Sequence, residues 1–264
     1  MTEEERLLEQ AKAYNDAKNH SAAFRILSDL TDRRYAPAQN YLGFCYANGK
    51  GVAQNYRTAA QWYAKAAEQG LASAQFNLGN SYYNGQGVAQ NYRTAAQWYT
   101  KAAEQGLADA QFNLGNSYYD GKGVAQDYRA AAQWYTKAAE QGYAKAQCNL
   151  GNSYYNGKGV AQNYRTAAQW YIKAAEQGLV SAQYNLGNMY YDGKGVAQNY
   201  RTAVYWYTKA AQQGHANAQC NLGVCYNNGN GVPRDKAKAI YWFKKAAEQG
   251  HEKAGQILKK IRGY

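Results

Sequence analysis

The sequence has little of what strands, membrane spans or kinked helices need. It contains only two prolines and few runs that alternate apolar with polar residues, whereas Ala, Gln, Lys and Glu are abundant. These preferences predict an all-helical chain. No apolar run approaches the roughly 18 residues of a membrane helix, so no membrane span is expected.

Export signals and disulfide pairs are also missing from the pattern. Residues 1–5 are acidic rather than basic, and no apolar segment follows them. Cys220 and Cys225 lie about 140° apart around a helix, which is poor geometry for a disulfide. Free thiols fit a reducing compartment, which favours the cytoplasm. The periplasm or secretion stays open if a signal peptide has been removed. The four cysteines without an obvious pairing are Cys45, Cys148, Cys220 and Cys225.

What the chain does contain is a repeated Leu-Gly pair. Successive glycines of this pair are 36 residues apart, and self-similarity at such a period is typical of a solenoid. Each unit of a solenoid buries its apolar face only by stacking on its neighbours. The six pairs are Leu42-Gly43, Leu78-Gly79, Leu114-Gly115, Leu150-Gly151, Leu186-Gly187 and Leu222-Gly223.

One repeat, residues 71–106, predicts two helices joined by a turn. The first helix, helix A over about 72–84, has a core stripe of Ala74, Leu78 and Tyr82, and Gly79 beside it admits a close neighbour. The glycines at 85 and 87 predict a turn with positive φ. Helix B, over about 92–105, pairs small residues with one tyrosine in the stripe Ala95, Tyr99, Ala102 and Ala103.

The segments that flank the six repeats predict terminal caps. Residues 1–35 form a capping helix pair in which Ala23, Leu27 and Leu30 take core positions. Residues 252–264 form a lone capping helix in which Leu258 takes the core position. Polar outer faces on terminal units are what keep repeat arrays soluble.

The repeat pattern resembles the Sel-one-like repeat family, a longer-looped relative of the tetratricopeptide repeats. The resemblance covers residues 36–251 and rests on Ala-x-x-x-Leu-Gly-x-x-Tyr, then Gly-x-Gly-Val, then Ala-x-x-Trp-Tyr-x-Lys-Ala-Ala-x-x-Gly. It implies a right-handed α-solenoid of antiparallel helix pairs, with helix A on the concave surface and helix B on the convex one. It also implies an adaptor or scaffold, often bacterial, that mediates protein–protein interaction.

Catalytic, cofactor and metal sites are not expected. A catalytic site breaks the periodicity of an array, and no acid, base or nucleophile does so. The loop Gly121-Lys122-Gly123 suggests a phosphate cradle, but its counterparts change the middle residue, so we interpret it as a turn. His20, His215 and His251 are interpreted as packing or solvated residues. The once-per-repeat tryptophans, such as Trp98, are interpreted as packing between repeats.

Helix A carries a second stripe that points away from helix B and is the candidate partner-binding face. It contains an asparagine ladder (Asn80, Asn116, Asn152 and Asn188) and a tyrosine ladder (Tyr83, Tyr119, Tyr155 and Tyr191), both broken in the first and last repeats. A carboxamide offers a donor and an acceptor, as a peptide backbone does. Duplication that copied polar surface residues explains the ladders equally well. The remaining candidate binding residues are Phe76, Phe112 and Tyr184.

Three classes of function are weighed against each other. A protein scaffold that binds a peptide or partner protein is the first, and an enzyme is disfavoured. The alternative is binding of a glycan or polyanion, because residues 1–143 hold 14 basic and 13 acidic residues whereas residues 144–264 hold 16 and 5. An acidic partner at this basic half fits the same asymmetry, and nucleic acid is not the expected partner.

Overall fold

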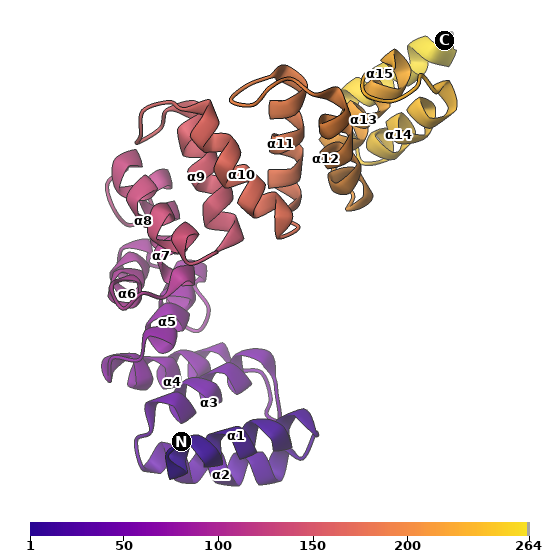
Figure 1. The fold of residues 1–264 in the computed structure, drawn as a ribbon. Helices are drawn as coiled ribbons and strands as arrows, with labels where there is room; N and C mark the ends of the chain where they lie inside the picture. The colour runs from indigo at the N-terminus through magenta and orange to yellow at the C-terminus, as the bar shows by residue number, and fades with distance from the viewer. Residues whose placement is uncertain (263–264) are drawn as a thin grey trace. The chain divides into compact units, whose positions relative to one another are not determined.

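The computed structural model describes residues 1–262, and every regular element in that range is an α-helix (Figure 1). This confirms the all-helical prediction. Helices A are α3, α5, α7, α9, α11 and α13, and each is followed by its helix B, antiparallel to it. The helices of the described residues are α1 (Glu3–Asp16), α2 (His20–Asp32), α3 (Ala36–Asn48), α4 (Tyr56–Glu68), α5 (Ala72–Asn84), α6 (Tyr92–Glu104), α7 (Ala108–Asp120), α8 (Tyr128–Glu140), α9 (Ala144–Asn156), α10 (Tyr164–Glu176), α11 (Val180–Asp192), α12 (Tyr200–Gln212), α13 (Ala216–Asn228), α14 (Lys236–Glu248) and α15 (Glu252–Arg262).

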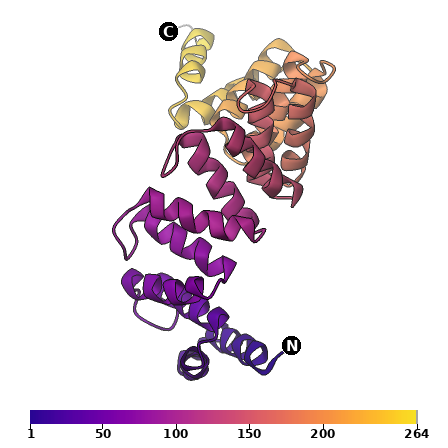
Figure 2. The ribbon, with the colours of Figure 1, turned by 90° about the vertical axis from the view of Figure 1, so that its left-hand side faces the viewer.

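The helices group into two compact units, Met1–Ala138 and Ala139–Tyr264. In the first unit each helix from α1 to α7 packs against the next one along the chain, and in the second unit the same holds from α9 to α15. Figure 2 shows this succession of helix pairs within each unit from the side. Contacts that are most extensive between helices adjacent in sequence are the mark of a repeat array.

Local sequence signals begin and end the helices of each repeat. Helix α5 ends at Gly85, whose φ of 69° is left-handed, and Gly87 follows with a φ of 76°, so the predicted turn is confirmed. Helix α6 begins after Asn91, whose side chain accepts a hydrogen bond of 3.0 Å from the backbone N–H of Thr94. Helix A matches the predicted bounds, and helix B ends one residue earlier than predicted, at Glu104.

The seam within and between repeats is packed as the sequence predicts. A Cβ placed on Gly79 would lie 2.7 Å from ring carbons of Tyr99, so only glycine admits this tyrosine of helix B. Trp98 of α6 packs against the core that α4 and α5 build, which confirms its interpretation as packing between repeats. The ammonium group of Lys101 lies 4.1 Å from the centroid of the Trp98 ring and forms a cation–π contact with it.

A buried glutamine on helix A, bonded to an exposed glutamine that follows helix B, was missed by the sequence analysis. Gln75 is only 5% exposed, and its Nε2 donates to the backbone oxygen of Ala67 at 3.3 Å. Its Oε1 accepts from Gln105 Nε2 at 2.7 Å. A buried amide is tolerated because both of its ends are bonded. The same side-chain pair joins Gln39 with Gln69, Gln147 with Gln177, Gln183 with Gln213 and Gln219 with Gln249.

The first helix pair and the last helix follow the pattern with local differences. Ala23, Leu27 and Leu30 of α2 are buried, as the sequence predicts. On α15 the fully buried side chain is Ala254, whereas Leu258, expected at the core position, is only half-buried. In the repeats a following helix B covers this leucine, and α15 is the last helix of the described residues.

The cysteine thiols are all free and buried. Burial raises the pKa of Cys45 to about 11 and that of Cys225 to about 12, so both thiols stay protonated at neutral pH. The thiols therefore act as small apolar core residues.

No helix in residues 1–262 combines the length and apolar character of a membrane span.

Candidate functional site

The asparagine ladder lies on helix A, and its oxygen atoms are already engaged. Asn80 Oδ1 accepts a hydrogen bond of 2.7 Å from the hydroxyl of the buried Tyr99. The same oxygen accepts from Asn113 Nδ2 at 3.3 Å. In the second unit Tyr171 and Tyr207 donate in the same way, each at 2.7 Å, to Asn152 and Asn188.

This geometry corrects the idea that each ladder asparagine offers a donor and an acceptor. The oxygen atom is used twice inside the protein, and the Nδ2 groups of Asn80, Asn152 and Asn188 have no hydrogen-bond partner among the described residues. An asparagine ladder in this arrangement presents donors. A ligand that meets it has to bring acceptors.

A second row of asparagines, missed by the sequence analysis, lies three residues before each ladder position. Asn113, Asn185 and Asn221 each donate Nδ2 to the ladder asparagine of the preceding repeat, at 3.3, 3.3 and 3.1 Å. This row was recognisable as Asn-Leu-Gly in every repeat but the first. Its function depends on a neighbour in another repeat, which the period alone does not reveal.

The tyrosine ladder is held by the glycine loop of the next repeat. Lys122 Nζ donates to the hydroxyl of Tyr83 at 3.3 Å and lies 5.7 Å from its ring centroid. Lys194 Nζ donates to Tyr155 at 3.1 Å, and Asn230 Nδ2 donates to Tyr191 at 2.8 Å. The hydrogen bond that Lys122 donates to the hydroxyl of Tyr83 raises the pKa of this lysine. Lys122 therefore positions a tyrosine.

The candidate residues on the first turns of helix A contribute mainly to packing. Phe76 lies against the core Tyr99 with ring centroids 6.0 Å apart, and Phe112 lies against Tyr135 at the same distance. Tyr184 lies 6.3 Å from Tyr207. The rings are half-buried, and none of the three lines the polar cavities described next.

Both ladders meet in cavities between successive helices A. In the first unit Asn80, Tyr83 and Asn116 line a cavity of about 280 Å³ together with Asn113. In the second unit a cavity of about 240 Å³ is lined by Asn152, Tyr155 and Asn188, and one of about 230 Å³ by Asn188 and Tyr191. Tyr119, the remaining ladder residue, lies edge-on to Tyr128 with ring centroids 5.1 Å apart. In each unit, residues of both predicted ladders therefore line the same cavities.

The histidines have structural positions. His215 and His251 each precede a helix, and Nδ1 of each accepts from the backbone N–H three residues later, at 3.2 Å. Burial lowers the pKa of His215. His20 Nδ1 lies 2.7 Å from Asn15 Oδ1. In residues 1–262 no group of three or more His, Cys, Asp or Glu residues could hold a metal ion.

One helix B of the second unit has an unusual exposed face. Tyr205 on α12 stands where the earlier repeats have glutamine, and it is 51% exposed. Lys209 Nζ lies 4.8 Å from its ring centroid. Helix α12 contains no acidic residue, and Tyr241 on α14 is 52% exposed. The two tyrosines were not among the predicted site residues, although each breaks the repeat pattern.

The fold described above defines a helical repeat protein. The Sel1 repeat model matches residues 36–71, 72–107, 108–143, 144–179, 180–215 and 216–251. The chain therefore belongs to the Sel1 repeat family, the Sel-one-like repeats, and its repeats form an α-solenoid. Sel1 repeats generally mediate protein interactions.

Solved structures support the same family. The chain is 38% identical to a protective antigen of uropathogenic Escherichia coli that displays the SLR fold, with a TM-score of 0.94 over 98% of this chain. It spans 56% of the length of that antigen. It is 36% identical to a Sel1 repeat protein from Oxalobacter formigenes, with a TM-score of 0.80 and coverage of 91% of this chain and 96% of the other.

A more distant similarity extends to the tetratricopeptide repeats. The C-terminal part of a TPR repeat-containing protein from Cytophaga hutchinsonii is 18% identical, with a TM-score of 0.52 and coverage of 90% and 93%. At this identity the similarity concerns the fold alone. A search of curated proteins found no match.

Proposed function

We propose that this chain is a non-enzymatic scaffold that binds an extended segment of a partner protein along the helix A faces. The observation that carries the proposal is the recurrence of one polar cavity, with an asparagine Nδ2 donor and a tyrosine, between successive helices A. A peptide backbone brings a regular row of carbonyl acceptors. A regular row of donors holds such a chain without selecting its side chains.

The tyrosines make the same surface suitable for protein recognition. Tyr83, Tyr155 and Tyr191 are half-buried and held by neighbouring side chains, so little conformational entropy is lost when a partner packs on them. Tyrosine supplies a rigid apolar area with a polar tip, a combination enriched at interfaces. Packing on tyrosine and donation from asparagine together suit a peptide.

A matched substitution separates binding from stability at this face. Changing Asn80, Asn152 and Asn188 to Asp keeps the oxygen that accepts from the buried tyrosine but replaces the outward donor by an acceptor. We expect the triple variant to capture its partner from a lysate of the source cell at least about tenfold less well, with a small change in melting temperature. Unchanged capture would contradict the proposal.

Truncating the ladder side chains is a less selective test, because it also affects stability. Removing Asn116, Tyr119, Asn152 and Tyr155 together also removes the partner of a buried tyrosine hydroxyl, because Tyr171 donates to Asn152. The melting temperature of this variant is therefore expected to fall even if binding is unaffected. Aspartate at the asparagine positions avoids this ambiguity.

The second candidate function is binding of a polyanion or acidic partner at the second unit. The specific observation is the acid-free face of α12, where Arg201, Tyr205 and Lys209 follow one another at intervals of four residues. Cations beside an exposed aromatic ring suit sulfated or carboxylated ligands. Heparin added to the lysate capture distinguishes the two, because only binding that depends on these charges is displaced by it and by salt.

A further inference from the structure

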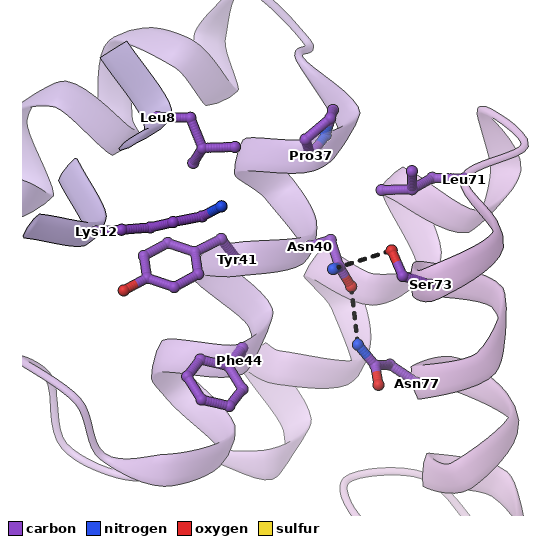
Figure 3. A pocket seen from close by; sticks show the side chains of 9 residues that line it. All are labelled: Leu8, Lys12, Pro37, Asn40, Tyr41, Phe44, Leu71, Ser73 and Asn77. Carbon is purple, nitrogen blue, oxygen red and sulfur yellow. Dashed lines mark hydrogen bonds between the residues drawn. The ribbon is translucent and has the colours of Figure 1, made fainter. Parts of the chain in front are cut away.

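One mainly apolar cavity of the first unit lies outside the row of polar cavities. It has a volume of about 420 Å³ and lies between α1, α3 and α5, the helices that begin the array (Figure 3). Its wall is mainly apolar, formed by Leu8, Pro37, Tyr41, Phe44 and Leu71. Figure 3 shows Lys12 extending over the face of Tyr41 at one side of the opening.

The apolar wall results from substitutions in the first repeat. At the two positions where the second repeat has Asn77 and Asn80, the first repeat has Tyr41 and Phe44. The two rings stack with centroids 5.9 Å apart and an angle of 21° between their planes. Asn15 Nδ2 donates to the Tyr41 hydroxyl at 3.1 Å, which fixes that ring. The cavity is therefore preformed and offers aromatic surface instead of amide donors.

Two ammonium groups flank the stacked rings. Lys12 Nζ lies 5.9 Å from the Tyr41 centroid, and Lys50 Nζ lies 5.2 Å from the Phe44 centroid. Lys12 also pairs with Glu9 at 2.6 Å, but both side chains are solvent-exposed, so the pair is weak and an incoming carboxylate can compete. Lys50 makes no ion pair with any described residue.

The opposite wall is polar but internally bonded. Asn40 Nδ2 donates to Ser73 Oγ at 3.3 Å, and Asn77 Nδ2 donates to Asn40 Oδ1 at 2.9 Å (Figure 3). These side chains hold α3 against α5. Lys12 is the charged residue of the lining, and Lys50 belongs to the site only through its position beside Phe44. A ligand that fits has an apolar group for the cavity and a negative charge for its edge.

We propose that this cavity is an anchor subsite, which takes one large apolar side chain of the bound segment while a neighbouring carboxylate pairs with Lys12 and Lys50. This inference rests on the proposed function, and it adds the chemistry of the partner: an aromatic or leucine-sized residue next to an acidic one. The polar row holds any extended backbone. The anchor subsite supplies the selection and the register that the repeated donors lack.

The test uses three N-acetylated, C-amidated dipeptides: phenylalanyl-aspartate, phenylalanyl-asparagine and alanyl-aspartate. Each is titrated into the full chain while the backbone amide signals of Leu8, Tyr41, Phe44 and Leu71 are followed by NMR. We expect saturable shifts at these residues with phenylalanyl-aspartate and binding weaker by roughly three- to tenfold with phenylalanyl-asparagine. Alanyl-aspartate is expected to give no saturable shifts, since it leaves the cavity unfilled.

The matched variant carries Tyr41→Asn with Phe44→Asn, which installs the residues that the second repeat already has. Asparagine at position 44 also gives the hydroxyl of Tyr63 the acceptor that Tyr99 has, so the variant is expected to fold. It should lose at least about tenfold in affinity for phenylalanyl-aspartate. In a second variant, Lys12→Gln with Lys50→Gln, the two phenylalanyl peptides should bind equally.

The outcomes are separable from those of the proposed function. Equal binding of all three peptides, shifts elsewhere on the chain, or no binding would overturn the anchor subsite. The Asn80, Asn152 and Asn188 to Asp variant leaves the lining of this cavity intact and should bind phenylalanyl-aspartate like the parent chain. If it also captures partner as well as the parent does, the polar row fails while the anchor subsite stands.

Discussion

The first and second repeats have nearly the same backbone but different faces. Their helices A, α3 and α5, are both 13 residues long and end at a left-handed glycine with φ of 67° and 69°. Both helices B start after an asparagine cap. The outward residues differ, because Tyr41, Phe44 and Ala47 in one repeat correspond to Asn77, Asn80 and Tyr83 in the other. The residues that pack helices against each other thus determine the fold, whereas the outward residues of helix A can differ between repeats.

The comparison extends to the loop that follows each repeat. Tyr83 is held by Lys122 from the loop of the next repeat. Ala47 stands at the corresponding position of the first repeat, and the loop residue in register with Lys122 is Gln86. Lys194 and Asn230 hold Tyr155 and Tyr191 in the same way. The middle residue of the glycine loop thus donates to the ladder tyrosine of the preceding repeat in these three cases.

The largest expected effect distinguishes the loop glycines of the two repeats. A Cβ on Gly87 would collide with the backbone oxygen of Tyr56, whereas a Cβ on Gly51 would meet the side chain of His20 at 2.9 Å. Both glycines have positive φ, which alone costs roughly 1–3 kcal/mol in another residue. We expect Gly51→Ala to stay within that range and Gly87→Ala to exceed it, because backbone of α4 has to move.

Urea unfolding of the two variants, with Gly106→Ala as a control, measures this difference. Gly106 has a φ of 92° and nothing within 4 Å of an added Cβ, so its substitution reports backbone strain alone. Equal losses in all three variants would show that the contact with Tyr56 is not part of the seam.

The next effect concerns the buried tyrosines of helix B. The hydroxyl of Tyr99 donates to Asn80. In the first repeat Phe44 stands at the position of Asn80, and the hydroxyl of Tyr63 has no hydrogen-bond partner among the described residues. We expect Tyr99→Phe to lower the free energy of unfolding by about 1 kcal/mol and Tyr63→Phe to change it by less than half of that. Chemical denaturation at neutral pH checks it, and a reversed order would contradict the geometry.

The smallest expected effect is a difference in pH dependence. Burial raises the pKa of the Cys45 thiol from 9.0 to about 11 and that of Tyr63 from 10.0 to about 12. The folded chain holds these protons more tightly, so their contribution to stability is complete below pH 9 and is lost as the pH rises through 11 and 12. The second repeat has Ser81 at the position of Cys45.

Replacing Cys45 by Ser isolates the contribution of the thiol. Between pH 8 and pH 10.5 the melting temperature of Cys45→Ser should fall less than that of the parent chain, because one ionising group of the unfolded state is gone. Identical slopes would indicate that Cys45 is accessible to solvent in the folded chain.

Much of the repeat unit could be predicted from the sequence alone. The 36-residue period, the helix bounds at 72–84, the turn at Gly85 and Gly87, and the close approach of helix B at Gly79 all follow from local rules. These features depend on residues within one helix pair, or on a glycine whose lack of a side chain indicates a close contact.

Parts of the candidate site could not be predicted, because they depend on which atoms meet across repeats. The sequence places Asn80 and Tyr83 on one face, but it does not show that Tyr99 takes the oxygen of Asn80 or that Lys122 reaches Tyr83. From the sequence alone Gln75 is expected at the surface. In the structure it is buried, because Gln105 and Ala67 form hydrogen bonds with the two ends of its amide. A carboxamide has two chemically different ends, and only its neighbours decide which one is presented.

The sequence by itself determined the class of this protein, since helical periodicity, glycine placement and a fixed period leave a stacked array of helix pairs as the way to bury its apolar stripes. Only the tertiary structure decided the chemistry of the faces. Stacking brings Tyr41 and Phe44 together with Lys12 from α1, and it converts asparagines from two repeats into a row of donors. Those contacts join residues about one repeat apart, and hydrogen-bond direction is settled only when both partners are in place.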